Sequence, residues 1–163
     1  MDVSRIARGE IYGAVASAVL VASLLFLDWF SLSAVDSREE QNIGWLCGTG
    51  DFDCTGFESF PILRWLLIAA ATAPLILAWI MARQHKLSWA PGELTMVVGF
   101  TAFVLLLYNG FIDKPGVGVE SIGVSLQLGY WVAVIAAAGI SLSGIARTVE
   151  SQKGAARKAP GTV

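Results

Sequence analysis

The sequence predicts an all-α membrane protein, an antiparallel four-helix transmembrane bundle with a disulfide-braced extracytoplasmic loop. Three observations predict this class. Of the 163 residues, 55% are hydrophobic and only 15% are charged, which is too apolar for a typical soluble domain. The chain contains four long apolar runs. The polar segments around these runs alternate between basic and acidic along the chain, as expected of loops on opposite sides of a membrane.

Each apolar run is long enough for a helix to cross a hydrocarbon core about 30 Å thick. We expect spans at about residues 10–30, 62–82, 92–112 and 122–146, which together form one domain, residues 1–147, with an outer loop at 31–61. An alternative outer end of the fourth span is at Tyr130 and Trp131, which are typical interfacial residues, and it leaves residues 116–126 partly as loop. Pro74 lies in the middle of the second span. Because proline removes a backbone hydrogen bond, we expect a kink at this position.

Charge distribution predicts the orientation of the chain. Basic residues precede the first span, connect the second to the third, and follow the fourth, so these segments and both termini are expected in the cytoplasm of a plasma-membrane protein. The acidic segment 31–61 then faces outward. The tail, residues 148–163, is polar and basic and is expected to be disordered. Cleavage of a signal peptide after the first apolar run is an alternative interpretation of the N-terminus.

Small residues recur at four-residue spacing and indicate where helices approach closely in lipid. These stripes are Gly9, Gly13 and Ser17, then Ala14, Ala18 and Ala22, in the first span; Ala69 and Ala73 in the second; and Ala137 with Ser141 and Gly139 with Ser143 in the fourth. We expect them to form contacts within the bundle. Contacts between copies of the chain are the alternative.

Both cysteines lie in the sequence GWLCGTGDFDC, residues 44–54. On the outer side of a membrane, Cys47 and Cys54 at this spacing predict a disulfide, which stabilises the ordered loop by about 2.5 kcal/mol in the chain-entropy model. A redox centre is a weaker interpretation, because the chain has no C-x-x-C motif and no second cysteine pair. A weak divalent-cation site at Asp51, Asp53 and Glu58 is the other alternative.

Large aromatic side chains in the outer loop need a place to pack. We expect some to cover the helix ends, and we predict that Trp45 or Phe52, held by the disulfide, anchors another membrane protein or a second copy. Asp28, at the outer end of the first span, is a candidate intramembrane polar residue. Its alternative roles are an interfacial cap and a partner for Arg64.

Few residues suit chemistry or nucleic-acid binding. His85 is the only histidine, and no cysteine pair or carboxylate pair is expected on the same inner side, so we expect no enzymatic activity, no metal and no cofactor. A basic stripe with interleaved aromatics is missing from the sequence, which argues against nucleic-acid binding. The expected partners are the lipid bilayer and a membrane protein or second copy.

Three blocks of the sequence resemble an uncharacterised group of small four-span proteins from actinobacteria. The blocks are FLDWFSLSA at 26–34, TGFESFPILRWLLIAA at 55–70 and YNGFIDKPG at 108–116. The group commonly has proline at the position of Asp28, and two prolines at those of Lys114 and Pro115. This resemblance implies a bacterial plasma-membrane protein and brings no known activity.

The sequence Gly44-Trp45-Leu46 before the two cysteines also resembles the first extracellular segment of claudin-like four-span proteins. In those proteins a tryptophan-bearing stretch precedes two cysteines, although its residue order and spacing differ from those here. Taken together, the sequence predicts a non-enzymatic accessory or interaction subunit that acts through its outer loop. An oligomeric small transporter or channel subunit is the alternative function.

Overall fold

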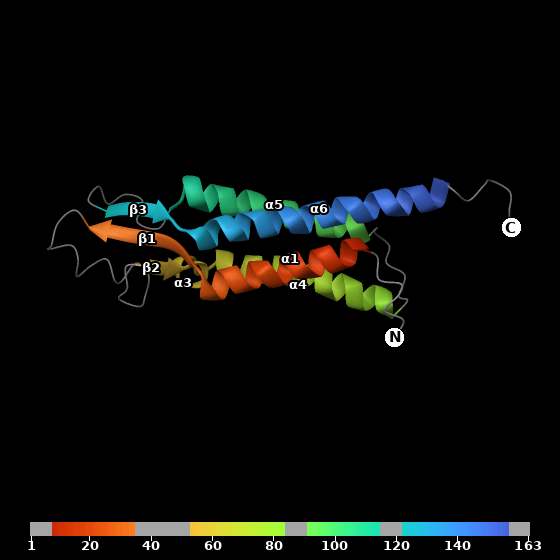
Figure 1. The fold of residues 1–163 in the computed structure, drawn as a ribbon, viewed down its shortest axis with the longest axis horizontal. Coiled ribbons are helices and arrows are strands. Elements are labelled where there is room, and N and C mark those ends of the chain that lie inside the picture. Colours follow the sequence, from red (N-terminus) through yellow and green to blue (C-terminus); the bar gives the residue numbers. More distant parts are fainter. Residues whose placement is uncertain (1–7, 35–52, 84–90, 115–121, 157–163) are drawn as a thin grey trace.

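The computed structural model describes residues 8–34, 53–83, 91–114 and 122–156, and it is mostly helical (Figure 1). Its elements are α1 (Arg8–Phe26), β1 (Asp28–Ala34), β2 (Asp53–Thr55), α3 (Gly56–Ser59), α4 (Leu63–Ala82), α5 (Pro91–Phe111), β3 (Ile122–Leu126) and α6 (Leu128–Ala156). The all-helical prediction therefore describes the long elements, but it is wrong for three strands that the sequence analysis did not predict.

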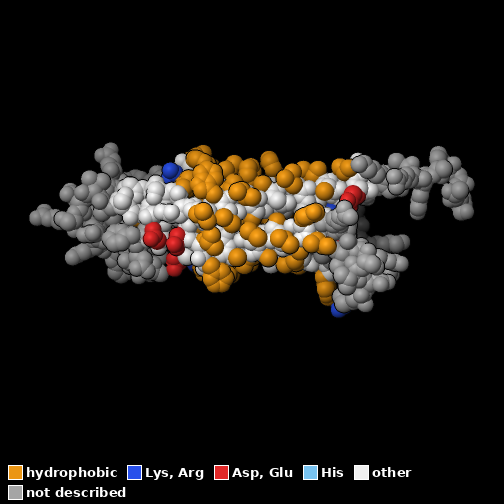
Figure 2. Space-filling view, viewed as in Figure 1, with side chains coloured by type: hydrophobic (Ala, Val, Ile, Leu, Met, Phe, Trp, Pro, Cys, Tyr) orange, Lys and Arg blue, Asp and Glu red, His pale blue; other side chains and the backbone are white. Residues whose placement is uncertain are grey.

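Among the described residues, three helices are long and apolar enough to cross a membrane. Their candidate spans are Gly9–Phe26 in α1, Gly92–Phe111 in α5 and Leu128–Glu150 in α6. The apolar part of α4, Leu63–Leu77, is shorter. Figure 2 shows hydrophobic side chains over the middle of the molecule and acidic ones near both ends of that zone. These features are compatible with a multi-pass membrane protein.

The last helix, α6, is the centre of the helical part. It packs along α5 and α1, and α1 also packs against α4. The contact between α4 and α5 is less extensive than these three. Within an apolar stretch of 18 residues in each candidate span, 56% of the α6 residues are buried, against 33% for α1 and 28% for α5. Helix α6 is thus surrounded mainly by other parts of the protein, whereas α1 and α5 keep broad apolar faces exposed.

Small residues bring the backbones of α5 and α6 together. A Cβ on Gly99 of α5 would collide with the backbone of Ser141, and a Cβ on Gly144 of α6 would collide with the backbone of Met96. The Ser141 hydroxyl donates to the Met96 carbonyl at 3.4 Å. Close backbone approach and interhelical hydrogen bonds are the main sources of helix association in lipid, so they account for this extensive contact.

The contact between α1 and α6 combines small residues with one ion pair. A Cβ on Gly13 would lie 2.9 Å from the Ser143 hydroxyl oxygen. Farther along, Arg147 Nη2 lies 3.3 Å from Glu10 Oε1, and these two side chains are only 9% and 16% exposed. The ion pair joins the start of α1 to α6 at the end of the helices away from the strands.

The three strands form an antiparallel sheet in the order β2-β1-β3. The sheet lies beyond one end of the long helices, here named the sheet end (Figure 1). The β1–β3 ladder pairs Phe30 with Leu126 and Ala34 with Ile122. Apolar and polar residues alternate as F-S-L-S in β1 and as V-S-L at the end of β3, which suits a half-buried sheet.

This sheet corrects two of the predicted spans. The first was expected to reach residue 30, but α1 ends at Phe26; the fourth was expected to begin at 122, but α6 begins at Leu128. The physical reason is that the two segments pair with each other. The ladder satisfies their backbone groups without a helix.

The predicted disordered tail also needs correction. The final helix continues to Ala156, so residues 148–156 are helical, while 157–163 lie outside the described residues. A tertiary contact supports the first residue of this extension: a Cβ on Gly92 of α5 would lie 2.6 Å from the Thr148 hydroxyl oxygen. That hydroxyl donates to the Gly144 carbonyl at 3.0 Å. The polar composition of the tail therefore did not prevent it from continuing the helix, and Val149, Glu150 and Gln152 are exposed there.

Candidate interaction site at the sheet end

The junction between α1 and the sheet is built around Trp29. In the β1–β2 ladder, Asp28 pairs with Thr55 and Phe30 with Cys54, so β1 has one extra residue at this point. Such a bulge bends a strand and redirects its side chains. Trp29 and Phe30 are adjacent in sequence and both are fully buried, whereas neighbours in a regular strand point to opposite faces.

Hydrogen bonds connect Trp29 to two helices. Its indole Nε1–H donates to the Ser23 carbonyl at 3.0 Å and to the Ser23 hydroxyl oxygen at 3.2 Å. The Ser23 hydroxyl in turn donates to the Gly129 carbonyl at 2.6 Å. Because all these atoms are buried, the network fixes the sheet to the ends of α1 and α6.

Trp29, Phe30, Phe60 and Tyr130 form a compact group, here called the aromatic cluster. The Trp29 and Tyr130 ring centroids are 6.1 Å apart in an edge-on arrangement, and those of Phe30 and Phe60 are 5.6 Å apart. The Phe30 ring also lies 6.1 Å from that of Tyr130. Aromatic rings at these separations attract each other. The cluster therefore packs in the space between the sheet and the helices.

Tyr130 connects this cluster to α5. Its hydroxyl donates to the Leu106 carbonyl at 3.1 Å, and its ring occupies the space that a side chain on Gly110 would need. The ring of Trp29 likewise fills the space beside Gly56 of α3. The absence of a Cβ at these two glycines therefore lets the large rings lie against backbone.

The short segment from β2 to α4 is ordered by local polar contacts. The Thr55 amide donates to Glu58 Oε2 at 3.1 Å, and the Thr55 hydroxyl donates to the same oxygen at 2.9 Å. Arg64 donates to the Phe57 carbonyl at 3.3 Å, and its guanidinium lies 4.7 Å from the centre of the Phe57 ring. These contacts hold α3 against the start of α4.

The structure places only some of the predicted site residues. Asp28 is the first residue of β1 and its side chain is exposed, while Arg64 bonds to Phe57 as described above. Cys54 is fully buried in β2, and the part of the chain that the structure describes contains no free cysteine. Cys47, Trp45 and Phe52 lie outside the described residues.

Two of the three acids considered for a divalent cation are described at this end. Within the four described ranges, no group of three or more His, Cys, Asp or Glu residues could hold a metal ion. Of the acids considered for a divalent cation, Asp53 is exposed in β2 and Glu58 is bonded to Thr55. Asp51 lies outside those ranges. The described acids thus make local structural contacts or face outward.

The sheet also anchors both ends of the segment that carries the predicted interaction residues. Residues 35–52 follow β1 directly and precede β2 directly. In the ladder between these strands, Ser31 pairs with Asp53. The two ends of the segment are therefore attached to neighbouring strands above the aromatic cluster.

No protein-family model, curated protein or solved structure matches this chain. Its site is accordingly interpreted from its own geometry, and the two resemblances noted in the sequence stay predictions. The aromatic cluster was not foreseen. The signals that could have indicated the sheet are the two-residue alternations in F-S-L-S and V-S-L-Q.

Proposed function

We propose that the protein is a non-enzymatic accessory or interaction subunit of the plasma membrane that binds its partner through residues 35–52. The partner is another membrane protein or a second copy of the chain. The observation that carries this proposal is the hydrogen-bonded sheet, sealed to the helices by the aromatic cluster, because it provides a fixed support for both ends of that segment.

The proposed membrane arrangement has four spans, with α4 as the second. Helix α4 has 20 residues, which is within the range needed to cross the hydrocarbon core. Arg8, Arg83 and Arg147 lie at the end opposite the sheet, whereas Arg64 and Lys114 lie at the sheet end. This distribution supports an outward-facing sheet and cytoplasmic termini by the positive-inside rule.

Cysteine labelling tests this orientation in intact cells. We expect a cysteine introduced at Ser37 to react with an impermeant thiol reagent, and cysteines at Ser88 and Ser151 to be protected until the membrane is permeabilised. The same variants labelled after permeabilisation serve as their own controls. Reaction of position 151 from outside the cell would overturn the proposed orientation.

A disulfide between Cys47 and Cys54 completes the proposed support. Cys54 is buried and is not a free thiol, and the sequence contains one other cysteine. The bond would close a loop of about eight residues and stabilise it by about 2.5 kcal/mol in the chain-entropy model. It would also hold Trp45 and Phe52 close to β2, which limits the entropy lost when either ring binds a partner.

Alanine substitution of the two aromatic residues tests the function. Trp45→Ala or Phe52→Ala should reduce co-purification or self-association at least about tenfold, equivalent to about 1.4 kcal/mol, as expected at a binding hot spot. Trp79→Ala is the matched control, because Trp79 is an exposed tryptophan at the opposite end of α4. Thermal unfolding of all three variants should resemble that of the unmodified protein.

Native mass spectrometry from mild detergent provides the readout. It should detect either a homo-oligomer or a defined co-purifying membrane protein with the unmodified chain and with Trp79→Ala. A monomer without any partner would contradict the proposal. Unfolding of the helices by both loop substitutions would instead identify the segment as a structural lid.

A further inference from the structure

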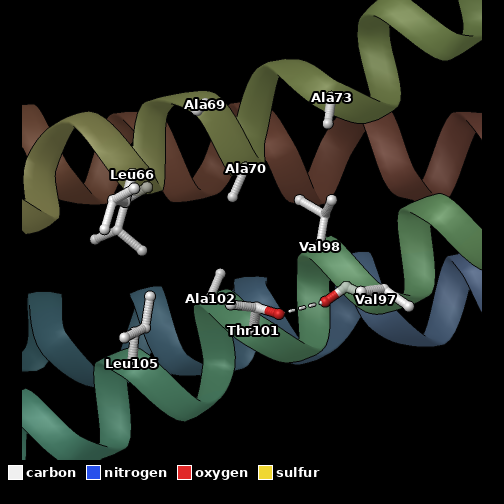
Figure 3. A pocket seen from close by; sticks show the side chains of 10 residues that line it. Leu66, Ala69, Ala70, Ala73, Val97, Val98, Thr101, Ala102 and Leu105 are labelled. Carbon is white, nitrogen blue, oxygen red and sulfur yellow. Dashed lines mark hydrogen bonds between the residues drawn. The ribbon is translucent and has the colours of Figure 1, made fainter.

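The contact between α4 and α5 contains an apolar groove with a volume of about 250 Å³ (Figure 3). Leu66, Ala70 and Ala73 line it from α4, and Val98, Ala102 and Leu105 line it from α5. Figure 3 shows these side chains pointing across the gap toward the opposite helix. The groove differs from the α5–α6 contact, where backbones meet.

The chemistry of the lining restricts what can occupy this space. Thr101 has the only side-chain hydroxyl in the lining, and this hydroxyl donates to the Val97 carbonyl of its own helix at 2.8 Å (Figure 3). A polar occupant would lose its hydration without gaining a matched set of partners. The lining therefore selects hydrocarbon.

The shape of α4 leaves one end of the groove open. Pro74 lies inside α4, directly after Ala73, and proline interrupts the helical hydrogen-bond ladder. Its ring faces α1, because a Cβ on Gly13 would lie 3.8 Å from Pro74 Cβ. Beyond Ala73 the ribbon of α4 turns away from α5 (Figure 3), so a long narrow molecule can enter lengthwise.

The groove is continuous with the surface that would face lipid. Leu66 and Val97 at its border are 50% and 54% exposed, and Trp65 and Phe100 beside them are also exposed. Water would find too few polar partners in such a space to be stable there. In a bilayer, an unfilled groove would lose dispersion contacts that a hydrocarbon chain can provide.

Size distinguishes a lipid chain from a protein helix. A helix with its side chains is about 10 Å in diameter, too wide to lie between α4 and α5 while these two helices stay in contact. A helix from a second copy would therefore rest on the borders and leave the groove unfilled. A single hydrocarbon chain is narrow enough to enter it.

We propose that the α4–α5 groove binds one acyl chain of a membrane phospholipid. This proposal requires that α4 and α5 lie in the membrane, but it does not depend on a partner for residues 35–52. Loss of partner binding in the loop variants would thus leave it intact, and a failed lipid experiment would leave the loop proposal intact.

Photolabelling of the full chain in lipid nanodiscs tests the proposal. The probe is a phospholipid with a diazirine in the middle of one acyl chain, and the labelled residues are mapped by mass spectrometry. Ala70 and Ala102 should be labelled, although they are only 7% and 2% exposed in the protein alone. Leu106 and Ala133, both fully buried outside the groove, should remain at background.

The second measurement uses a variant in which a larger side chain fills the groove. Ala70→Phe should reduce labelling of Ala102 about tenfold, equivalent to about 1.4 kcal/mol of chain binding. Ala18→Phe is the matched control, because Ala18 is exposed on α1, away from the groove, and it should leave Ala102 labelling unchanged. Exposed Val104 should be labelled in every variant, which confirms the presence of the probe.

Two results would overturn the proposal. Background labelling of Ala70 and Ala102 in the unmodified chain would show that no lipid chain enters the groove. Protein–protein crosslinks at these residues, with a dimer that disappears in Ala70→Phe, would identify a second copy as the occupant. If Ala70→Phe does not fold, Ala73→Leu replaces it, and the comparison in the unmodified chain still decides the outcome.

Discussion

Helix α5 makes two contacts that differ in kind. Toward α6, Gly99 and its neighbours allow backbone to meet backbone, and Ser141 adds an interhelical hydrogen bond. Toward α4, aliphatic side chains such as Val98 and Leu105 face a groove that the protein leaves unfilled. One helix thus has a closed contact on one side and an open contact on the other.

The difference shows what holds helices together in an apolar solvent. Leu and Val gain little by leaving lipid for another helix, because lipid tails are equally apolar. Gly and Ser contribute more to helix association, because they permit close backbone approach and hydrogen bonds between helices. We therefore expect substitutions at the closed contact to affect stability far more than substitutions of similar size in the groove.

The largest effect is expected at Gly99. Gly99→Val places a branched side chain against the Ser141 backbone, which cannot move without separating α5 from α6. We expect the free energy of unfolding to fall by about 3 kcal/mol, the upper part of the usual range for overpacking. Unfolding by SDS in mixed micelles, followed by circular dichroism, measures the change; a loss below about 1 kcal/mol would mean that the contact is not closed.

The next effect concerns the contact of α1 with α6 at the sheet end. Ser23→Ala removes a buried donor to the Gly129 carbonyl and a buried acceptor for Trp29. The free energy of unfolding should decrease by about 1–2 kcal/mol, because two buried hydrogen bonds of the hydroxyl are lost. Ser33→Ala is the control: its exposed hydroxyl donates to the Gly123 carbonyl at 3.2 Å, and equal losses in the two variants would contradict the network.

A smaller effect is expected for the ion pair at the opposite end. Glu10→Gln keeps the shape of the side chain but removes its charge beside Arg147, and should cost about 1 kcal/mol, since the pair is only partly exposed. The loss should diminish at high salt. A double-mutant cycle with Arg147→Gln measures the coupling, and a coupling of zero would mean that the pair does not contribute.

The smallest effect is expected in the groove. Thr101→Val conserves side-chain shape at an exposed position two residues from Gly99 on the same helix. It removes only a hydrogen bond to the Val97 carbonyl within α5, so the free energy of unfolding should change by less than about 0.5 kcal/mol. The same SDS titration applies, and a loss approaching that of Gly99→Val would remove the distinction between the two contacts.

The sequence predicted some of these contacts from small residues alone. Gly13 and Ser143 were expected to mark helix contacts, and they face each other between α1 and α6. Ala18 and Ala22 were expected to do the same, yet both are exposed. Spacing identifies a stripe that permits close approach, but the choice of stripe depends on which helices the connecting segments bring together.

The sheet end was less predictable. Hydropathy counts a residue such as Phe30 or Leu126 as apolar whether it lies in a helix or in a strand. The predicted first and fourth spans were therefore extended into β1 and β3. The aromatic cluster depends on pairing between segments far apart in sequence and on the bulge at Trp29. Neither is a property of one local segment, which is why Trp29 and Tyr130 were missed as a pair.

In this account, α5 packs closely against α6 on one side and borders a groove for a lipid chain on the other. Two adjacent leucines of α5 provide the most direct test of this arrangement. Leu105 lines the groove, whereas Leu106 is fully buried. In deuterated protein with protonated leucine methyl groups, in nanodiscs of protonated lipid, we predict nuclear Overhauser effects from acyl-chain methylenes to Leu105 and none to Leu106. The Leu105 signal should disappear in Ala70→Phe. Equal signals at both leucines, or none at Leu105, would contradict the account.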